Sequence, residues 1–213
     1  MMYTFNENFI LPLSHDEVVH GKCSLIGRQP GDIWRQFAGL RLLALYQITH
    51  PGGKLNFMGS EFGQFIEWRY YEQLEWFLLD YDHHRKHLEY TKALNNFYKK
   101  ETPLWSVDGS WDGFTWIDAN NNEQSIMSFY RTNKQRDQID VAVLNFEVPS
   151  YEKYRIGVPE PVWYTEAFSS DDIKYGGSGK VNTPRLYAKP IPAHGMPYSI
   201  EITVPPVGGF IFR

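Results

Sequence analysis

The sequence contains a single cysteine, Cys23, and therefore no pair that could form an internal disulfide. Disulfides are typical of secreted proteins, so this cysteine usage favours a reducing cytoplasm. The first residues, MMYTFNENF, lack the basic and apolar regions of a secretory signal. No run approaches the ~20 consecutive apolar residues of a membrane span. We therefore expect a cytoplasmic protein that does not interact with a membrane.

Runs of basic residues are also missing. The formal net charge is −4, and the charged residues are spread along the chain. Because nucleic-acid binding depends on a clustered basic surface, we expect no nucleic-acid partner. Apolar residues make up 42% and aromatic residues 16% of the sequence, which is typical of a globular protein with a substantial core.

Short apolar runs alternate with helical periodicity in the first half of the sequence. Residues 9–13 and 55–58 are typical of buried strands. One helix is predicted to begin after an N-cap at Asp32 and to end at the sequence HPGG, and a second is predicted near residues 83–100. This order of strand, helix, strand and helix predicts parallel strands joined by crossover helices.

The pattern changes after Glu101, where most of the 13 prolines lie. Helical periodicity gives way to short β-rich runs such as SIMSFYR, DVAVLNF, PVWYTEAF, YSIEITV and GGFIFR. These runs predict a β-sandwich domain. We place the boundary between two domains, 1–105 and 106–213, at this change.

The stretch SHDEVVHGK, residues 14–22, has the highest density of side chains that can carry chemistry. His15 and His20 are five residues apart, whereas helical zinc sites place two histidines four apart, so we expect no metal there. His83 and His87 have the four-residue spacing, but their charged neighbours indicate a solvated helix face. Asp16 follows the end of a predicted parallel strand, the edge at which α/β barrels carry active sites. An aspartate that caps a turn is the alternative.

Residues 14–22 resemble the last conserved catalytic segment of bacterial 1,4-α-glucan (glycogen) branching enzymes, members of the α-amylase superfamily. The resemblance extends through LNFMGSEFGQ (55–64), Glu67-Trp68 and Pro205-Pro206-Val207. It implies a multi-domain α/β plus all-β fold. Residues 1–105 would be the last two βα units of a catalytic (β/α)8 TIM barrel, and residues 106–213 a C-terminal β-sandwich domain.

The resemblance also implies roles for two residues. The family cleaves an α-1,4 link in a glucan and transfers the oligoglucan to a 6-hydroxyl through a covalent glycosyl-enzyme. Retaining chemistry of this kind needs a nucleophile and an acid/base, and nearby negative charge stabilises its oxocarbenium-like transition state. Asp16 matches the third acid, which stabilises the transition state, and His15 matches a residue that hydrogen-bonds the same sugar. The family's nucleophile and acid/base lie in segments that this chain does not match.

We therefore predict a C-terminal portion of a glycogen branching enzyme that is inactive alone, acts on glycogen or amylose with the rest of its parent, and needs no cofactor. A truncated barrel would leave strand edges and apolar side chains exposed, which predicts self-association. One alternative is a non-catalytic glucan-binding or scaffolding module, favoured by the missing carboxylates and the many aromatic residues. The other is an amylase-like glycoside hydrolase that transfers the glycosyl group to water.

Overall fold

The computed structural model describes residues 4–182 and 185–213. Its N-terminal part contains one parallel pair of strands, β1 (Ile10–Leu13) and β2 (Gly53–Asn56). Helix α1 (Ile33–Thr49) connects the two strands, and helix α2 (Asp82–Lys100) follows β2. The predicted order of strand, helix, strand and helix is therefore confirmed. Short 3-10 helices lie between and after these elements: η1 (His15–Glu17), η2 (Ser60–Phe62), η3 (Trp76–Asp80), η4 (Thr102–Leu104), η5 (Trp111–Gly113) and η6 (Ile173–Tyr175).

Local sequence accounts for both ends of α1. The Asp32 side chain accepts a 2.9 Å hydrogen bond from the Arg35 backbone N–H, which satisfies one of the free donors in the first turn. At the other end His50 is extended, because a residue that precedes proline is forced out of the helical region. The predicted N-cap and the predicted stop at HPGG are both confirmed.

The C-terminal part is built from antiparallel strands. A five-stranded sheet has the order β3-β4-β5-β11-β8, and two smaller pairs, β10-β6 and β7-β9, complete the β structure. The strands are β3 (Phe114–Asn121), β4 (Ile126–Thr132), β5 (Ile139–Asn145), β6 (Tyr151–Val158), β7 (Trp163–Tyr164), β8 (Glu166–Ser169), β9 (Leu186–Tyr187), β10 (Tyr198–Val204) and β11 (Gly208–Phe212).

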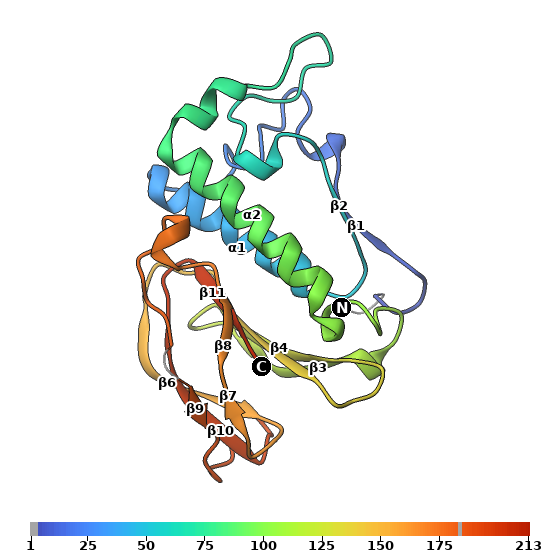
Figure 1. Ribbon diagram of the computed structural model, residues 1–213, viewed down its shortest axis with the longest axis vertical. Helices are drawn as coiled ribbons and strands as arrows, with labels where there is room; N and C mark the ends of the chain where they lie inside the picture. Colours follow the sequence, from blue (N-terminus) through green and yellow to red (C-terminus); the bar gives the residue numbers. More distant parts are fainter. Residues whose placement is uncertain (1–3, 183–184) are drawn as a thin grey trace.

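Two apolar cores lie on opposite faces of the five-stranded sheet. Helices α1 and α2 cover one face (Figure 1). Leu45, Tyr90 and Phe129 are buried together there. Strands β6 and β10 cover the other face, where Val143 packs with Ile156 and other β-branched residues. Because two sheet layers enclose this second core, the β-sandwich part of the prediction is confirmed. The first core joins the helices to the same sheet.

Arg131 on β4 fastens the end of α1 to the sheet. Its side chain is fully buried, and its guanidinium donates hydrogen bonds of 2.9 Å to the carbonyl oxygens of both Gly113 and Thr49. It also forms an ion pair with Asp108. The planar fork of arginine suits such a position because it can serve several acceptors at once.

The expected fold class, a C-terminal part of a (β/α)8 TIM barrel before a β-sandwich, is wrong. Within residues 4–182 and 185–213 the only parallel pairing is β1-β2, which closes nothing, and every other strand pairing is antiparallel. The two helices pack on the sandwich sheet, as the shared core of Leu45, Tyr90 and Phe129 shows. Self-association through a truncated barrel is likewise unsupported, because this part of the chain contains no barrel.

Strand burial also differs from the prediction. Residues 9–13 and 55–58 are predicted to form buried strands. In the structure, however, Ile10 is 60% exposed and Leu55 is 45% exposed. The strand β2 ends at Asn56, so half of the predicted run lies beyond it. Apolar composition predicts a strand, but only neighbouring elements decide whether its side chains are covered, and β1-β2 has no other strand beside it in the described structure.

Candidate functional site

The predicted site residues His15 and Asp16 lie in the 3-10 turn η1, directly after the carboxyl end of β1. Backbone hydrogen bonds from Glu17 to Ser14 (3.1 Å) and from Val18 to His15 (2.9 Å) close this turn. Val18 is buried beside Ile26 and Phe37, so it anchors the turn on the protein. The turn thereby exposes the side chains of His15 and Asp16 to solvent.

The structure brings His15 and Asp16 together. The His15 Nε2 atom lies 3.4 Å from Asp16 Oδ1, and the side chains are 53% and 72% exposed, respectively. An exposed carboxylate beside an imidazole can accept hydrogen bonds from sugar hydroxyls or face a developing positive charge. The alternative, an aspartate that caps the following turn, would place a backbone N–H on the Asp16 carboxylate, and the hydrogen bonds of the described residues include no such contact.

Two aromatic rings hold the His15 imidazole from behind. Its ring centroid lies 6.1 Å from that of Phe57 and 6.0 Å from that of Trp68, and these two rings pack edge to face at 5.2 Å. The Trp68 backbone N–H donates a 2.8 Å hydrogen bond to the Val18 carbonyl oxygen. The loop after β2 therefore supports the turn after β1, a relationship that sequence spacing alone did not reveal.

Glu67 holds the backbone of the segment that follows this turn. Its carboxylate accepts hydrogen bonds from the backbone N–H groups of Gly21 and Cys23, each at 2.9 Å to Oε1. These two bonds lower the pKa of the Glu67 carboxyl, because they favour its charged form. Gly21 has φ +85°, a conformation in which glycine is least strained. The pairing fixes the path of residues 20–24 behind the site.

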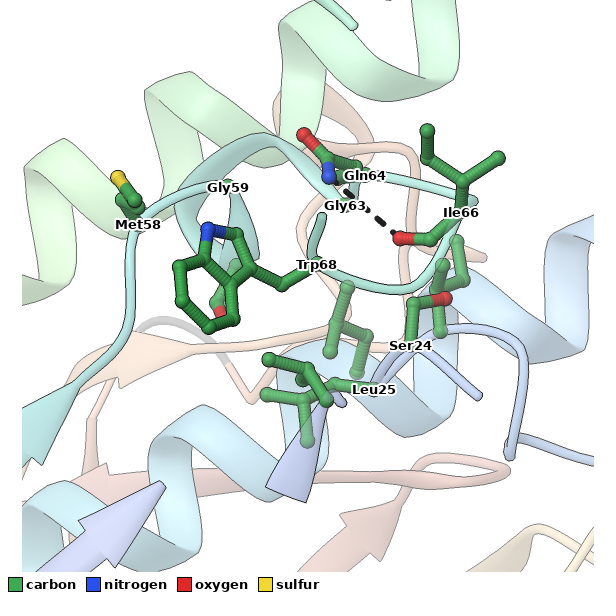
Figure 2. Close-up of a pocket in the computed structure, with 12 residues that line it drawn as sticks. Ser24, Leu25, Met58, Gly59, Gly63, Gln64, Ile66 and Trp68 are labelled. Carbon is green, nitrogen blue, oxygen red and sulfur yellow. Dashed lines mark hydrogen bonds between the residues drawn. The ribbon is translucent and has the colours of Figure 1, made fainter. Parts of the chain in front are cut away.

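A small pocket lies beneath the site, between the loops that follow β1 and β2. Figure 2 shows Trp68 on one side, Ser24 and Leu25 on another, and the Gln64 amide bonded to the Ile66 carbonyl. Its volume is about 20 Å³, which is space for one water molecule and far too little for a sugar ring. Neither His15 nor Asp16 lines this pocket, so it is separate from the two predicted site residues.

Exposed aromatic side chains gather in the segment that follows Trp68, and the sequence analysis did not single them out. Tyr70 is 84% exposed, Tyr71 66%, Trp76 52% and Phe77 58%. Large apolar side chains grouped on a surface mark contact sites more often than isolated ones do. A signal was present in the sequence, where four aromatic residues fall within eight positions of a segment that lacks helical or strand periodicity.

The interpretation of His87 as a solvated residue is wrong. Its side chain is 2% exposed, and burial lowers the pKa of its imidazole to about 3. The charged neighbours suggested a wet surface, but His87 lies on the face of α2 that packs against Phe37 of α1. Over the residues that the structure describes, no group of three or more His, Cys, Asp and Glu side chains could hold a metal ion.

Comparison with known proteins defines the class of the β-rich part. Residues 116–213 match the alpha amylase C-terminal all-beta domain. This match covers β4 to β11 and most of β3, and it agrees with the correction above, since an all-β domain and not a barrel portion is the recognised unit of this chain.

Relatives extend the likeness over the whole chain. The chain is 53% identical over 213 residues to the 1,4-alpha-glucan branching enzyme GlgB of Bacillus cereus. It is 52% identical to proteins of the same name from Halothermothrix orenii and Francisella philomiragia. Each match covers 100% of this chain but only 33–34% of the relative. Over its whole length the chain is similar to these 1,4-alpha-glucan branching enzymes, and it spans about one third of the length of these relatives.

In the two described segments, no helix combines the length and the apolar character needed to cross a membrane.

Proposed function

We propose that this chain is the C-terminal portion of a 1,4-α-glucan branching enzyme and contributes Asp16 and His15 to its active site. The parent protein would cleave an α-1,4 link in glycogen or amylose and transfer the oligoglucan to a 6-hydroxyl. Identity of 53% over this whole chain to one third of a protein named for this activity supports the proposal. The expected cytoplasmic location and the division near residue 105 remain parts of it.

Asp16 would act electrostatically. A retaining transglycosidase passes through an oxocarbenium-like transition state, and a carboxylate beside the sugar ring stabilises the positive charge that develops there. The 72% exposure of the Asp16 side chain supports this role, because the carboxylate is free to meet a substrate. The nucleophile and the acid/base would come from segments that are not matched in this chain.

His15 would position the same sugar through a hydrogen bond. Phe57 and Trp68 restrict its ring, so that little rotamer entropy is lost when the sugar binds. The observation that carries the proposal is the adjacency of these side chains, with His15 Nε2 lying 3.4 Å from Asp16 Oδ1 on one exposed turn.

A glucan-binding contribution without catalysis is the second candidate. The exposed rings of Tyr70, Tyr71, Trp76 and Phe77 favour it, since flat aromatic faces suit the apolar faces of sugar rings. The two candidates differ in one respect. A binding module would lose affinity for glucan when these rings are removed, yet its parent would not lose chemistry when Asp16 is changed.

The experiment is a chimera in which this chain replaces the corresponding third of the Bacillus cereus relative. Branching of amylose, followed by iodine staining and by analysis of α-1,6 links, is expected in the chimera. The 213-residue chain alone should show neither branching nor release of reducing sugar. Release of reducing sugar by the chimera without α-1,6 links would favour the hydrolase alternative. A folded but inert chimera would contradict the proposal.

A further inference from the structure

A second candidate site lies in the β-rich part, separate from Asp16. A cavity of about 370 Å³ opens between the N-terminal end of β5, the end of α2 and the segment before β7. This volume is within the range of about 300–1,000 Å³ that is typical of small-molecule sites. Its polar walls are mostly acidic: Glu101, Asp137, Asp140 and Glu160, with Arg213 as the basic member.

Asp140 is the unusual member of this group. Its side chain is 2% exposed, and its Oδ2 atom has no hydrogen-bond partner. Burial raises the pKa of the Asp140 carboxyl to about 7, and the nearby Glu101 charge acts in the same direction. A buried carboxylate without a donor is unfavourable, and proteins normally provide one. Asp140 also lines the cavity, so its wall contains a buried carboxylate that lacks a hydrogen-bond donor.

The charges around Asp140 do not supply that donor. Arg213 pairs with Glu101 at 2.8 Å, and Arg131 on the neighbouring strand pairs with Asp108. The guanidinium of Arg131 also donates to two backbone carbonyls, so its donors are committed. Both arginines lower the pKa of Asp140 less than burial raises it. Each cation is matched by an anion, so the charge of Asp140 is left uncompensated.

The rim increases this excess of negative charge. Asp137 and Glu160 are both exposed, and neither forms an ion pair within residues 4–182 and 185–213. Ile139, Val162 and Tyr164 add apolar atoms to the lining, which also contains the amide of Gln138. A ligand that fits must therefore carry positive charge and N–H donors at one end and apolar atoms beside them.

A metal ion does not fit this description. No group of three potential ligands is arranged for one anywhere in the described segments, and Mg²⁺ or Ca²⁺ requires about six or more oxygen ligands. An ammonium group is satisfied by fewer acceptors, and its alkyl chain can lie against apolar walls.

We propose that this acidic cavity binds an alkylammonium group, whose N–H donors reach the Asp140 carboxylate while its alkyl chain contacts Val162 and Tyr164. The group can belong to a small aliphatic diamine or to the lysine side chain of a polypeptide. The inference does not depend on the role of Asp16, because the residues involved are different.

The test is isothermal titration calorimetry on the 213-residue chain at pH 8. The probes are 1,4-diaminobutane, n-butylammonium, n-butanol, the amide of Nα-acetyl-lysine and MgCl₂. Saturable binding of the ammonium compounds and none of n-butanol is expected. Tighter binding of the diamine indicates a small-molecule source, whereas tighter binding of the lysine derivative indicates a polypeptide. Absence of binding by all ammonium probes, or equal binding of n-butanol or MgCl₂, would overturn the proposal.

Variants make the test specific to the cavity. Asp140→Asn should weaken ammonium binding by about 30-fold or more, the effect expected when one partner of a buried charged hydrogen bond is removed. Asp112→Asn is the matched control, because Asp112 is exposed and pairs with Arg136 elsewhere. It should bind as the unchanged chain does, and an equal loss in both variants would contradict the assignment.

Val162→Lys provides a second route if Asp140→Asn does not fold. Val162 is 43% exposed, so a longer side chain can be accommodated, and its own ammonium group would occupy the cavity. Binding of added ammonium should then be lost.

The pH dependence is a further test. Binding should weaken more than tenfold between pH 8 and pH 5.5, because the Asp140 carboxylate gains a proton in this range. The other charged groups near Asp140 are Glu101, Asp137, Glu160, Arg131 and Arg213. Unchanged affinity in Val162→Lys, or at pH 5.5, would place the ligand elsewhere.

Discussion

The Arg41 guanidinium of α1 donates a 2.8 Å hydrogen bond to the carbonyl oxygen of Ser170, which lies 129 residues further along the chain. Two more donors of the same side chain reach the carbonyl oxygens of Tyr175 and Gly176, at 3.1 and 3.3 Å. Arg41, Ser170 and Tyr175 are all buried, so water has little access to most of these contacts. The helices and the β-rich part are therefore joined by polar contacts as well as by a common apolar core.

Replacing Arg41 should destabilise the whole chain. Arg41→Met keeps most of the apolar volume but leaves three carbonyl groups without donors, so we expect a loss of about 2–4 kcal/mol in the free energy of unfolding. Urea denaturation followed by circular dichroism measures it. Arg35→Met, on the exposed side of the same helix, is the control and should change stability by less than about 0.5 kcal/mol. Equal effects of the two variants would refute the anchoring role.

Asp16→Asn should remove most of the activity of the Bacillus cereus chimera. Loss of one group that stabilises transition-state charge typically costs a factor of about 10² to 10³ in kcat. Because Asp16 is exposed, its replacement should leave the melting temperature unchanged. Branching kinetics and thermal unfolding should be measured together. Near-normal branching by a folded Asp16→Asn chimera would exclude the catalytic role.

His15→Ala should weaken the same chimera less than Asp16→Asn. The imidazole supplies one hydrogen bond to sugar, worth about 1 kcal/mol net, whereas Asp16 also responds to developing charge. A larger change in KM than in kcat is expected if His15 mainly binds substrate. His20→Ala, an exposed histidine of the same segment, is the matched control. A more severe defect in His15→Ala than in Asp16→Asn would reverse this division of roles.

Glu67→Gln should loosen the segment behind the site. The carboxylate holds the N–H groups of Gly21 and Cys23, and hydrogen exchange of these two amides should accelerate by about tenfold when the charge is removed. Because the pKa of Glu67 is lowered in the folded protein, its stabilising effect is present above the unfolded pKa and is lost as pH falls through the folded value. Acid should therefore lower the protection factors of these two amides as the variant does, once the slower intrinsic exchange in acid is divided out. Protection factors that stay the same after both changes would argue against this pairing.

The raised pKa of Asp140 predicts that the free energy of unfolding falls as pH rises. Its pKa is raised to about 7, so the folded state binds more protons than the unfolded state between the ordinary carboxyl pKa and pH 7. The unfolding free energy should decrease by several kcal/mol across this window, since one pKa unit corresponds to about 1.4 kcal/mol. Asp140→Asn should flatten the profile. Glu166, whose pKa burial also raises to about 7, contributes in both proteins, so the difference between the two profiles is the measurement. Parallel profiles would show that Asp140 does not titrate in this way.

Local sequence signals were sufficient for the elements that depend on local chemistry. The N-cap of α1 follows from Asp32, and β5 and β11 follow from short runs of branched and aromatic residues. Strand β6, with the sequence YEKYRIGV, was missed because Glu152, Lys153 and Arg155 conceal its apolar positions. Its half-buried pattern becomes clear only when β10 lies beside it.

Features that depend on distant segments could not be predicted in the same way. The motif around Asp16 indicated the exposed corner, but the support of His15 by Phe57 and Trp68 requires the loop after β2 to return to it. The barrel assignment failed because two βα units say nothing about which surface their helices cover. The cavity at Asp140 combines residues from four separate parts of the chain, and no spacing rule connects them.

The position of β11 in its sheet has a consequence for synthesis on the ribosome. This strand lies between β5 and β8, and it pairs with both, so the sheet stays divided until Gly208–Phe212 leave the exit tunnel. At roughly 5–20 residues per second, the stretch between Asn145 and Gly208 takes several seconds to make. Throughout that interval the edge of β5, with the apolar residues Val141 and Val143, has no partner strand. Helices α1 and α2 are already complete at that stage. The nascent chain therefore depends on them to cover one face of the unfinished sheet and to prevent its contact with other chains.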